Sequence, residues 1–112
     1  MKNHQIIFKD IAWNETSIGA KQKTYQTGNT KIRLIQFTDQ FEEKEWCQKG
    51  HIGYVLNGEM TIAFEHHEEH FVSGDGFEIL AGSADKHKVI IAPHKWAELI
   101  VFELGQTLCK HN

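Results

Sequence analysis

The strongest constraint on the fold of this chain is an Asn-Gly pair, Asn57-Gly58, that lies between two runs of β-forming residues. The runs are 51–56 and 59–64, and both are rich in aliphatic, aromatic and β-branched side chains. Asn-Gly in this setting is typical of a tight type I′ turn, because both central residues of that turn need a positive φ. The sequence therefore predicts a β-hairpin over 51–64, with Leu56 opposite Glu59.

Alternation along this predicted hairpin assigns its side chains to two faces. One face carries His51, Gly53, Val55, Met60, Ile62 and Phe64. The other face carries Ile52, Tyr54, Leu56, Glu59, Thr61 and Ala63. Both faces are substantially apolar, so each must be covered by another part of the protein or by a partner.

Further short strands are predicted on both sides of this segment. Residues 31–37 follow a Thr-Gly-Asn-Thr turn, and later β-rich runs occupy 71–72, 77–80, 87–91 and 96–104. No segment has a helical apolar period over more than two turns. Short strands, with nine glycines against one proline, favour an all-β antiparallel sandwich or barrel. With 112 residues, we expect a single domain over 1–112.

Charge and hydropathy exclude several classes of partner. Twelve basic and fifteen acidic residues give a formal charge of −3, so no nucleic-acid partner is expected. No apolar run approaches the roughly 20 residues that cross a bilayer, so no membrane partner is expected. The first residues contain no apolar signal segment, which predicts a cytoplasmic protein. In that compartment the two cysteines, Cys47 and Cys109, are expected to be reduced.

Two segments resemble the two sequence motifs of the cupin family. Residues 74–82, Gly-Asp-Gly-Phe-Glu-Ile-Leu-Ala-Gly, followed by His87, are similar to the second motif. Residues 54–59, Tyr-Val-Leu-Asn-Gly-Glu, are similar to the end of the first motif. The resemblance implies a jelly-roll barrel, also described as a double-stranded β-helix. It also implies a protein that is often dimeric and holds a metal inside the barrel with three histidines and a carboxylate.

The resemblance further implies which residues of this chain hold a metal. When Gly58 is matched to the glycine of the first motif, His51 stands where the family has a glutamate. Glu45 and Cys47 then stand where the family has paired histidines, and His87 corresponds to the histidine of the second motif. The implied ligands are thus Glu45, Cys47, His51 and His87. Thiolate and imidazole suit a divalent transition metal such as zinc, iron or nickel.

Each implied ligand also has a purely structural interpretation. Cys47 can be a buried small hydrophobe and His51 a hydrogen-bonded barrel residue, as in cupins that have lost their metal. Glu45 belongs to a charged run typical of a solvated face, and His87 is flanked by charged residues typical of an exposed loop. The tract 66–70, His-His-Glu-Glu-His, is interpreted as the solvated tip of a hairpin and not as a metal site.

The predicted function is that of a metal-binding small cupin of unknown substrate, with three classes open. The first is a metal-dependent enzyme that acts on a small oxygenated molecule. The second is a non-catalytic cupin that binds or senses a small molecule, and the third is a dimeric scaffold with no ligand. A thiolate and two imidazoles inside a barrel favour the first two classes. Arg33 is a candidate to point into the barrel from its strand.

A homodimer is expected from the outer face of the segment 51–56. Ile52, Tyr54 and Leu56 would form an exposed apolar patch, which usually marks an interface. The alternative is that the apolar residues 6–8 cover this patch within the same chain.

Overall fold

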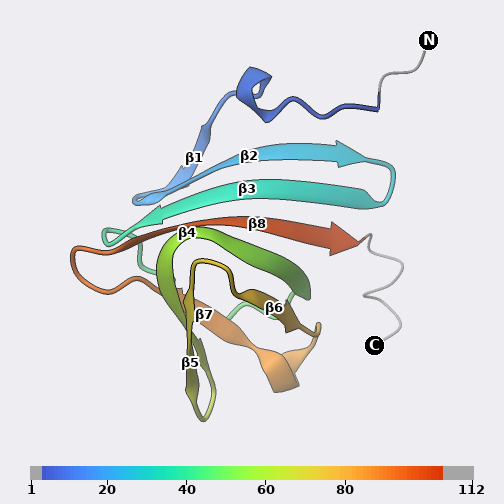
Figure 1. The fold of residues 1–112 in the computed structure, drawn as a ribbon. Helices are drawn as coiled ribbons and strands as arrows, with labels where there is room; N and C mark the ends of the chain where they lie inside the picture. Colours follow the sequence, from blue (N-terminus) through green and yellow to red (C-terminus); the bar gives the residue numbers. More distant parts are fainter. Residues whose placement is uncertain (1–3, 105–112) are drawn as a thin grey trace.

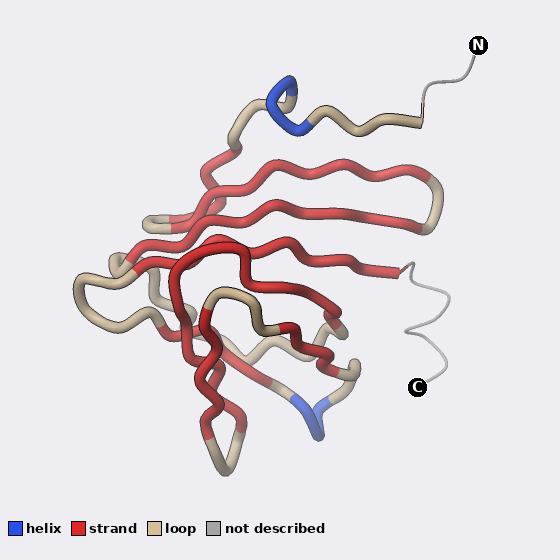
Figure 2. The backbone as a smooth tube through the Cα atoms, in the orientation of Figure 1, coloured by secondary structure: helices blue, strands red, loops and turns tan. Residues whose placement is uncertain are grey.

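The computed structural model describes residues 4–104, and their regular secondary structure is almost entirely β-strand (Figures 1 and 2). The strands are β1 (Asn14–Ser17), β2 (Ala20–Thr27), β3 (Thr30–Thr38), β4 (His51–Phe64), β5 (Glu68–Val72), β6 (Gly76–Ile79), β7 (His87–Ile90) and β8 (Trp96–Leu104). Two single-turn 3-10 helices, η1 (Phe8–Asp10) and η2 (Ser83–Asp85), lie in connections. The all-β prediction is confirmed. No helix in the described part of the chain is long and apolar enough to cross a membrane.

All strand pairs are antiparallel, and they form one sheet that curls on itself around β4 (Figure 1). The sheet order is β1-β2-β3-β8-β4-β5, and β6 and β7 also pair with β4. The first part of β4 pairs with β8 and β6, whereas its last part pairs with β5 and β7. β4 therefore passes from one side of the barrel to the other.

The hairpin predicted at Asn57-Gly58 is wrong, because β4 runs without interruption from His51 to Phe64. Its pairing with β8 shifts by one residue between Val55 and Asn57, which is the mark of a β-bulge. Gly58 has a φ of 80°, and a Cβ atom there would lie 2.0 Å from the carbonyl oxygen of Trp96. A bulge and a type I′ turn both need a residue that accepts a positive φ, so Asn-Gly suits either. Here the segment forms a bulge and not a turn, because β4 continues to pair with β8 through Asn57 and Gly58.

The two faces predicted for this segment are nevertheless correct. A bulge inserts one extra residue, so Val55 and Met60 point to the same side, as they would across a two-residue turn. Val55 is 0% exposed and Met60 is 1% exposed. On the opposite face, Ile52 is 50% exposed and Tyr54 is 46% exposed. The alternation of apolar side chains therefore predicted the inner face although the turn was misassigned.

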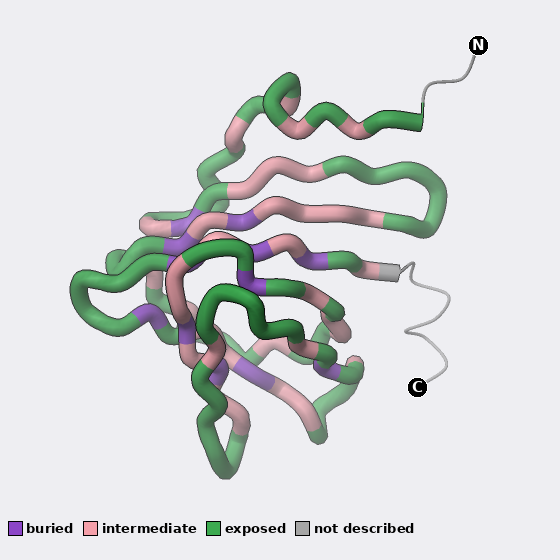
Figure 3. Tube along the Cα trace, in the orientation of Figure 1, coloured by how far each residue is buried: buried purple, intermediate pink, exposed green. Residues whose placement is uncertain are grey.

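The core is a single cluster of apolar side chains on the inner faces of the strands. Its members are Ala20, Ile35, Phe37, Val55, Met60, Ile62, Ile79, Ile91, Ala97, Leu99 and Val101. Figure 3 shows buried segments along β3, β8 and β4, while the β2–β3 turn and the β4–β5 hairpin are exposed. His87, only 4% exposed, is the one buried polar side chain in the part of the chain that the structure describes. A buried imidazole needs hydrogen-bond partners, and His87 lies in a cluster of polar side chains inside the barrel.

Candidate metal centre

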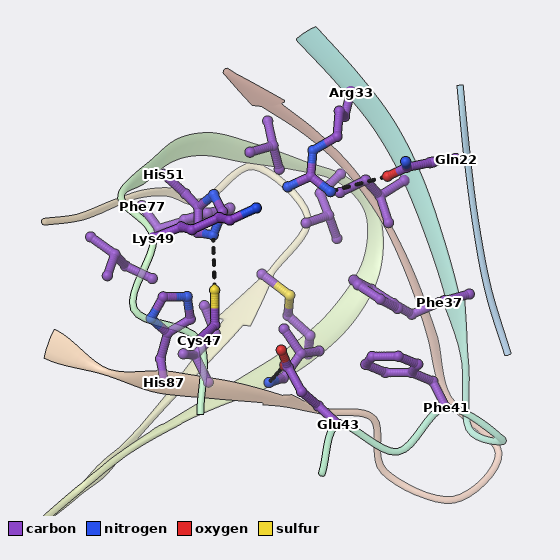
Figure 4. A pocket seen from close by; sticks show the side chains of 18 of the residues that line it. Gln22, Arg33, Phe37, Phe41, Glu43, Cys47, Lys49, His51, Phe77 and His87 are labelled. Atoms are coloured by element: carbon purple, nitrogen blue, oxygen red, sulfur yellow. Dashed lines mark hydrogen bonds between the residues drawn. The ribbon is translucent and has the colours of Figure 1, made fainter. Parts of the chain in front are cut away.

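Cys47, His51 and His87 come together at one end of the barrel interior (Figure 4). Cys47 lies in the connection between β3 and β4, His51 is the first residue of β4, and His87 is the first residue of β7. The backbones of Cys47 and His87 form an isolated β-bridge, in which each N–H donates to the other's carbonyl oxygen at 2.8 and 2.9 Å. The candidate ligand atoms of the three side chains lie within 4.8 Å of one another.

Each histidine presents one ring nitrogen to the cluster and uses the other nitrogen elsewhere. His51 Nε2 lies 3.6 Å from Cys47 Sγ, and His51 Nδ1 lies 3.0 Å from Glu103 Oε2. The Nδ1–H of His51 does not point straight at that oxygen, so the contact is an ion pair more than a well-formed hydrogen bond. His87 Nδ1 lies 3.0 Å from the carbonyl oxygen of Asp85. These outer contacts hold both imidazoles with Nε2 turned toward the cluster.

This arrangement is the one that histidine ligands of metals usually adopt. A ligating histidine commonly donates its second N–H to a carboxylate or a backbone carbonyl, which fixes the ring and its tautomer. A tetrahedral metal with the usual zinc–sulfur and zinc–nitrogen bond lengths would separate S and N by about 3.6 Å. The distance from Cys47 Sγ to His51 Nε2 is 3.6 Å, so this pair fits a metal without rearrangement. The residues present therefore fit a transition metal.

The same contacts shift the pKa values of all three groups. Burial by itself raises the pKa of the Cys47 thiol, but hydrogen bonds with His51 and His87 outweigh it and lower that pKa to about 5. Burial by itself lowers the pKa of His51, but its contacts with Cys47 and Glu103 raise that pKa by more, so the net shift is upward. The pKa of His87 is also raised, because its contacts with Cys47 and the Asp85 carbonyl exceed the effect of burial. At neutral pH the cluster thus holds a thiolate beside imidazoles.

Glu103, at the end of β8, is the residue that anchors His51. Its carboxylate also accepts a hydrogen bond from Arg33 Nη2 at 2.5 Å, and Arg33 Nη1 donates to Gln22 Oε1 at 3.0 Å. Burial raises the pKa of Glu103, but His51 and Arg33 lower it to about 2. The carboxylate is therefore ionised throughout the physiological range.

Glu103→Gln is expected to remove part of the stability of the metal-free protein at neutral pH. A carboxyl with a folded pKa of about 2 contributes its full stability above the unfolded pKa of about 4.3 and loses it as pH falls toward the folded value. The side chain is only 14% exposed, and we expect a loss of about 2 kcal/mol at pH 7. Urea unfolding of wild type and Glu103→Gln between pH 7 and 2 measures this. Curves that stay parallel down to pH 2 would contradict it, and Glu78→Gln, an exposed carboxylate on β6, is the control.

The structure does not bring Glu45 to this cluster. Its side chain is exposed, and it is not among the residues that line the adjoining cavity. Glu43, two residues earlier, is half-buried and faces the cavity instead, and its Oε1 accepts the backbone N–H of Val89 at 2.7 Å. Burial raises the pKa of Glu43. The backbone of 42–46 contains no strand, so counting along the sequence does not fix which glutamate of this segment faces the cavity.

Two of the alternatives raised from the sequence are settled by burial. His87 is not an exposed loop residue, because it is 4% exposed. The tract 66–70 is exposed throughout, which confirms the solvated hairpin, although 68–70 belong to β5. Cys47 is a free thiol, and Cys109 lies outside the described residues.

Glu103 and Glu43 were not identified from the sequence. Of the two, only Glu103 could have been recognised from it, by its place in the alternation of β8. Ala97, Leu99 and Val101 point inward along β8, and Glu103 continues this alternation. A carboxylate in an inward-facing position needs a cationic partner, which is here Arg33. The expectation that Arg33 points into the barrel is confirmed.

A cavity of about 290 Å³ adjoins the three candidate ligands inside the barrel. Figure 4 shows Cys47, His51 and His87 on one side of it, Phe37 and Phe41 on the opposite side, and the Arg33 guanidinium directed between them. The space beside Gly53 is filled by the ring of Phe77, because a Cβ atom on Gly53 would lie 2.5 Å from that ring.

A small antiparallel barrel that curls around an internal cavity is the fold of a small cupin domain. Comparison with solved structures supports this fold. An RmlC-like cupin from Shewanella frigidimarina superposes with a TM-score of 0.74 and 15% identity, over 93% of this chain and 92% of that one. KdgF from a Halomonas species gives 0.74 and 17% identity, over 94% and 96%. The polyketide cyclase RemF from Streptomyces resistomycificus gives 0.74 and 12% identity, over 90% and 78%.

The predicted jelly-roll cupin barrel is therefore confirmed as the fold of this chain. No protein-family model matches the sequence, and no curated protein matches it. Identities this low establish the fold alone, so the function must be argued from the site itself.

Proposed function

We propose that Cys47, His51 and His87 bind one divalent transition metal, and that the protein uses it on a small oxygenated molecule held in the adjoining cavity. The observation that carries this proposal is the orientation of the two imidazoles. Each presents Nε2 to the thiolate while its other nitrogen faces a carboxylate or a carbonyl oxygen. Zinc, iron and nickel suit such a donor set. Three protein ligands leave a coordination position open for a substrate oxygen, which a bound metal would polarise as a Lewis acid.

The residues around the cluster have separate roles in this proposal. Glu103 holds His51 and compensates its charge, and Arg33 in turn holds Glu103. The apolar wall of the cavity excludes water and so strengthens the electrostatic interactions beside it. The polyketide cyclase among the structural neighbours is an example of an enzyme built on this barrel. A reduced Cys47 is the ordinary state of a thiol in the cytoplasm, and we propose that compartment for the protein.

A second candidate function, nucleophilic catalysis by Cys47, is favoured by the successive contacts of Cys47 with His51 and of His51 with Glu103. A thiolate beside an imidazole that is oriented by a carboxylate is the arrangement of a nucleophilic cysteine. In this case the protein would need no metal, and Cys47 would react with an electrophilic substrate in the same cavity.

Elemental analysis of protein expressed with added zinc, iron or nickel separates the two candidates. The metal proposal predicts close to one equivalent per chain, and a fall in melting temperature when a chelator is added. A metal present at a hundredfold excess over its Kd stabilises the folded state by about 2.7 kcal/mol. Metal content far below one equivalent, with no effect of chelator and rapid alkylation of Cys47 by iodoacetamide at about pH 6, would favour the nucleophile instead.

We also propose that two copies of the chain associate through the outer face of the first part of β4. Ile52, Tyr54 and Leu56 are 50%, 46% and 37% exposed, and Phe102 beside Ile52 is 41% exposed. The segment 6–8 does not cover them, because it lies on the far side of β2 (Figure 1). Light scattering at micromolar concentration should give twice the 12.9 kDa chain mass, and Tyr54→Lys should lower it. A wild-type mass of one chain would contradict the dimer.

A further inference from the structure

The cavity beside the candidate metal centre has an apolar wall suited to a flat ring. Phe37 and Phe41 pack with ring centroids 4.6 Å apart and face the cavity from the side opposite the cluster (Figure 4). Aliphatic side chains add to this wall, among them Ile35, Met60, Ile62, Ile79, Val89 and Leu99. An apolar cavity of about 150 Å³ is sufficient for benzene. The 290 Å³ present here therefore leaves room for a ring and a polar substituent.

Two of the polar side chains that line this cavity, Arg33 and Lys49, are cationic. Arg33 lines the cavity, and its Nε atom is buried without a hydrogen-bond partner. A buried unpaired N–H group is costly, so this donor calls for an acceptor. Lys49 also lines the cavity and forms no ion pair within the described part of the chain. Arg33 and Lys49 therefore both line the cavity, and the Arg33 side chain keeps one buried donor, Nε, without a partner.

The neighbouring acids do not neutralise these donors. The single charge of Glu103 is shared among Arg33, His51 and, at 3.9 Å, Lys31. Glu43 is the carboxyl that lines the cavity, and its Oε1 already accepts the backbone N–H of Val89 at 2.7 Å. The thiolate of Cys47 is already compensated by the adjacent imidazoles. The acids around the cavity are thus engaged with other groups, and Arg33 and Lys49 are the cations in its lining that a ligand's carboxylate can approach.

We propose that this cavity binds a small carboxylate with a flat apolar body, its carboxylate directed at Arg33 and Lys49 and its ring against Phe37 and Phe41. Arginine and lysine bind carboxylates through charge-assisted hydrogen bonds. The inference deepens the proposed function and rests on it for the role of the ligand as substrate. The binding contacts themselves belong to the protein and need no metal.

Isothermal titration with benzoate and with its neutral isostere benzamide tests the inference. The deciding arm uses chelator-treated protein, because a carboxylate can also bind a metal directly. Hydrogen bonds to charged groups contribute about 1.5–3 kcal/mol, so benzoate should bind roughly tenfold or more tightly than benzamide. Equal Kd values for the two compounds, or no binding of benzoate, would overturn the proposal.

Two variants assign the contacts. Lys49 is exposed, so Lys49→Gln should leave the fold intact and weaken benzoate binding about threefold. Arg33→Lys keeps the charge beside Glu103 but removes Nε, and should weaken benzoate roughly tenfold with benzamide unchanged. Lys44→Gln is the matched control, because Lys44 is exposed on the same connection and does not line the cavity. Equal benzoate affinity in wild type and Lys49→Gln, with Arg33→Lys folded and also unchanged, would refute the assignment.

The outcome also separates this inference from the proposed function. Benzoate binding that depends on Arg33 and Lys49, in a protein that takes up no metal, would support the carboxylate site and overturn the metal proposal. One equivalent of metal per chain, with no preference for benzoate over benzamide, would support the metal proposal and overturn the carboxylate site.

Discussion

Cys47→Ser is expected to lose most of the bound metal while the metal-free protein keeps its fold. If the sulfur is a ligand, serine offers a harder and poorer donor at nearly the same volume. The half-buried position of Cys47 and its backbone bridge to His87 are unaffected by the exchange. The measurement is metal content together with melting temperature, with and without chelator. Wild type should lose stability on chelation, and Cys47→Ser should melt at one temperature in both conditions.

The control for this experiment is a histidine of the exposed tract. His67 stacks on Phe64, pairs with Glu69 Oε2 at 2.8 Å and is not among the three clustered candidate ligands. His67→Asn should retain the full metal content, which separates site binding from binding to surface histidines. If chelator lowers the melting temperature of wild type and Cys47→Ser equally, Cys47 is not a ligand.

Gly58→Ala should be the most destabilising single-methyl substitution in the described part of β4. Its Cβ would lie 2.0 Å from the carbonyl oxygen of Trp96, and its φ of 80° disfavours any side chain. The backbone conformation costs about 1–2 kcal/mol and the contact adds to it, so we expect a loss of about 3 kcal/mol. Denaturant unfolding measures this loss. Because the bulge carries β4 across the barrel, metal affinity should fall as well.

Gly28→Ala is the matched control for this prediction. Gly28 also has a positive φ, 53°, but nothing lies within 4 Å of the place that an added methyl group would take. It should therefore show only the backbone cost of about 1 kcal/mol. Equal losses for the two variants would mean that β4 does not approach β8 as closely as described.

The fold could be predicted from the sequence because the alternation of side chains still assigns the inner face of a strand when a local turn is misassigned. The inner residues of β4 were identified correctly even though a bulge was mistaken for a turn. A bulge and a two-residue turn both keep Val55 and Met60 on one side. Which of the two forms depends on pairing with β8, which is some 40 residues away in the sequence. Local pattern alone cannot detect such a distant partner.

Three of the four candidate ligands named from the sequence lie together in the structure. Cys47 is one of them although it lies in a connection, because its backbone bridge to His87 holds it there. His51 and His87 begin strands, and the motif spacing located them. Glu45 precedes β4 in an irregular connection, where the direction of a side chain does not follow from counting, and Glu43 faces the cavity in its place. The pairing of Glu103 with His51 joins residues far apart in the chain, so only the folded structure reveals it.

X-ray absorption spectroscopy of the zinc-loaded protein identifies the atoms bound to the metal. We expect one sulfur at about 2.3 Å and two imidazole nitrogens at about 2.0–2.1 Å from the metal. The sulfur contribution should vanish in Cys47→Ser. A shell of nitrogen and oxygen alone in the wild-type protein would contradict the assignment of Cys47, His51 and His87 as the metal centre.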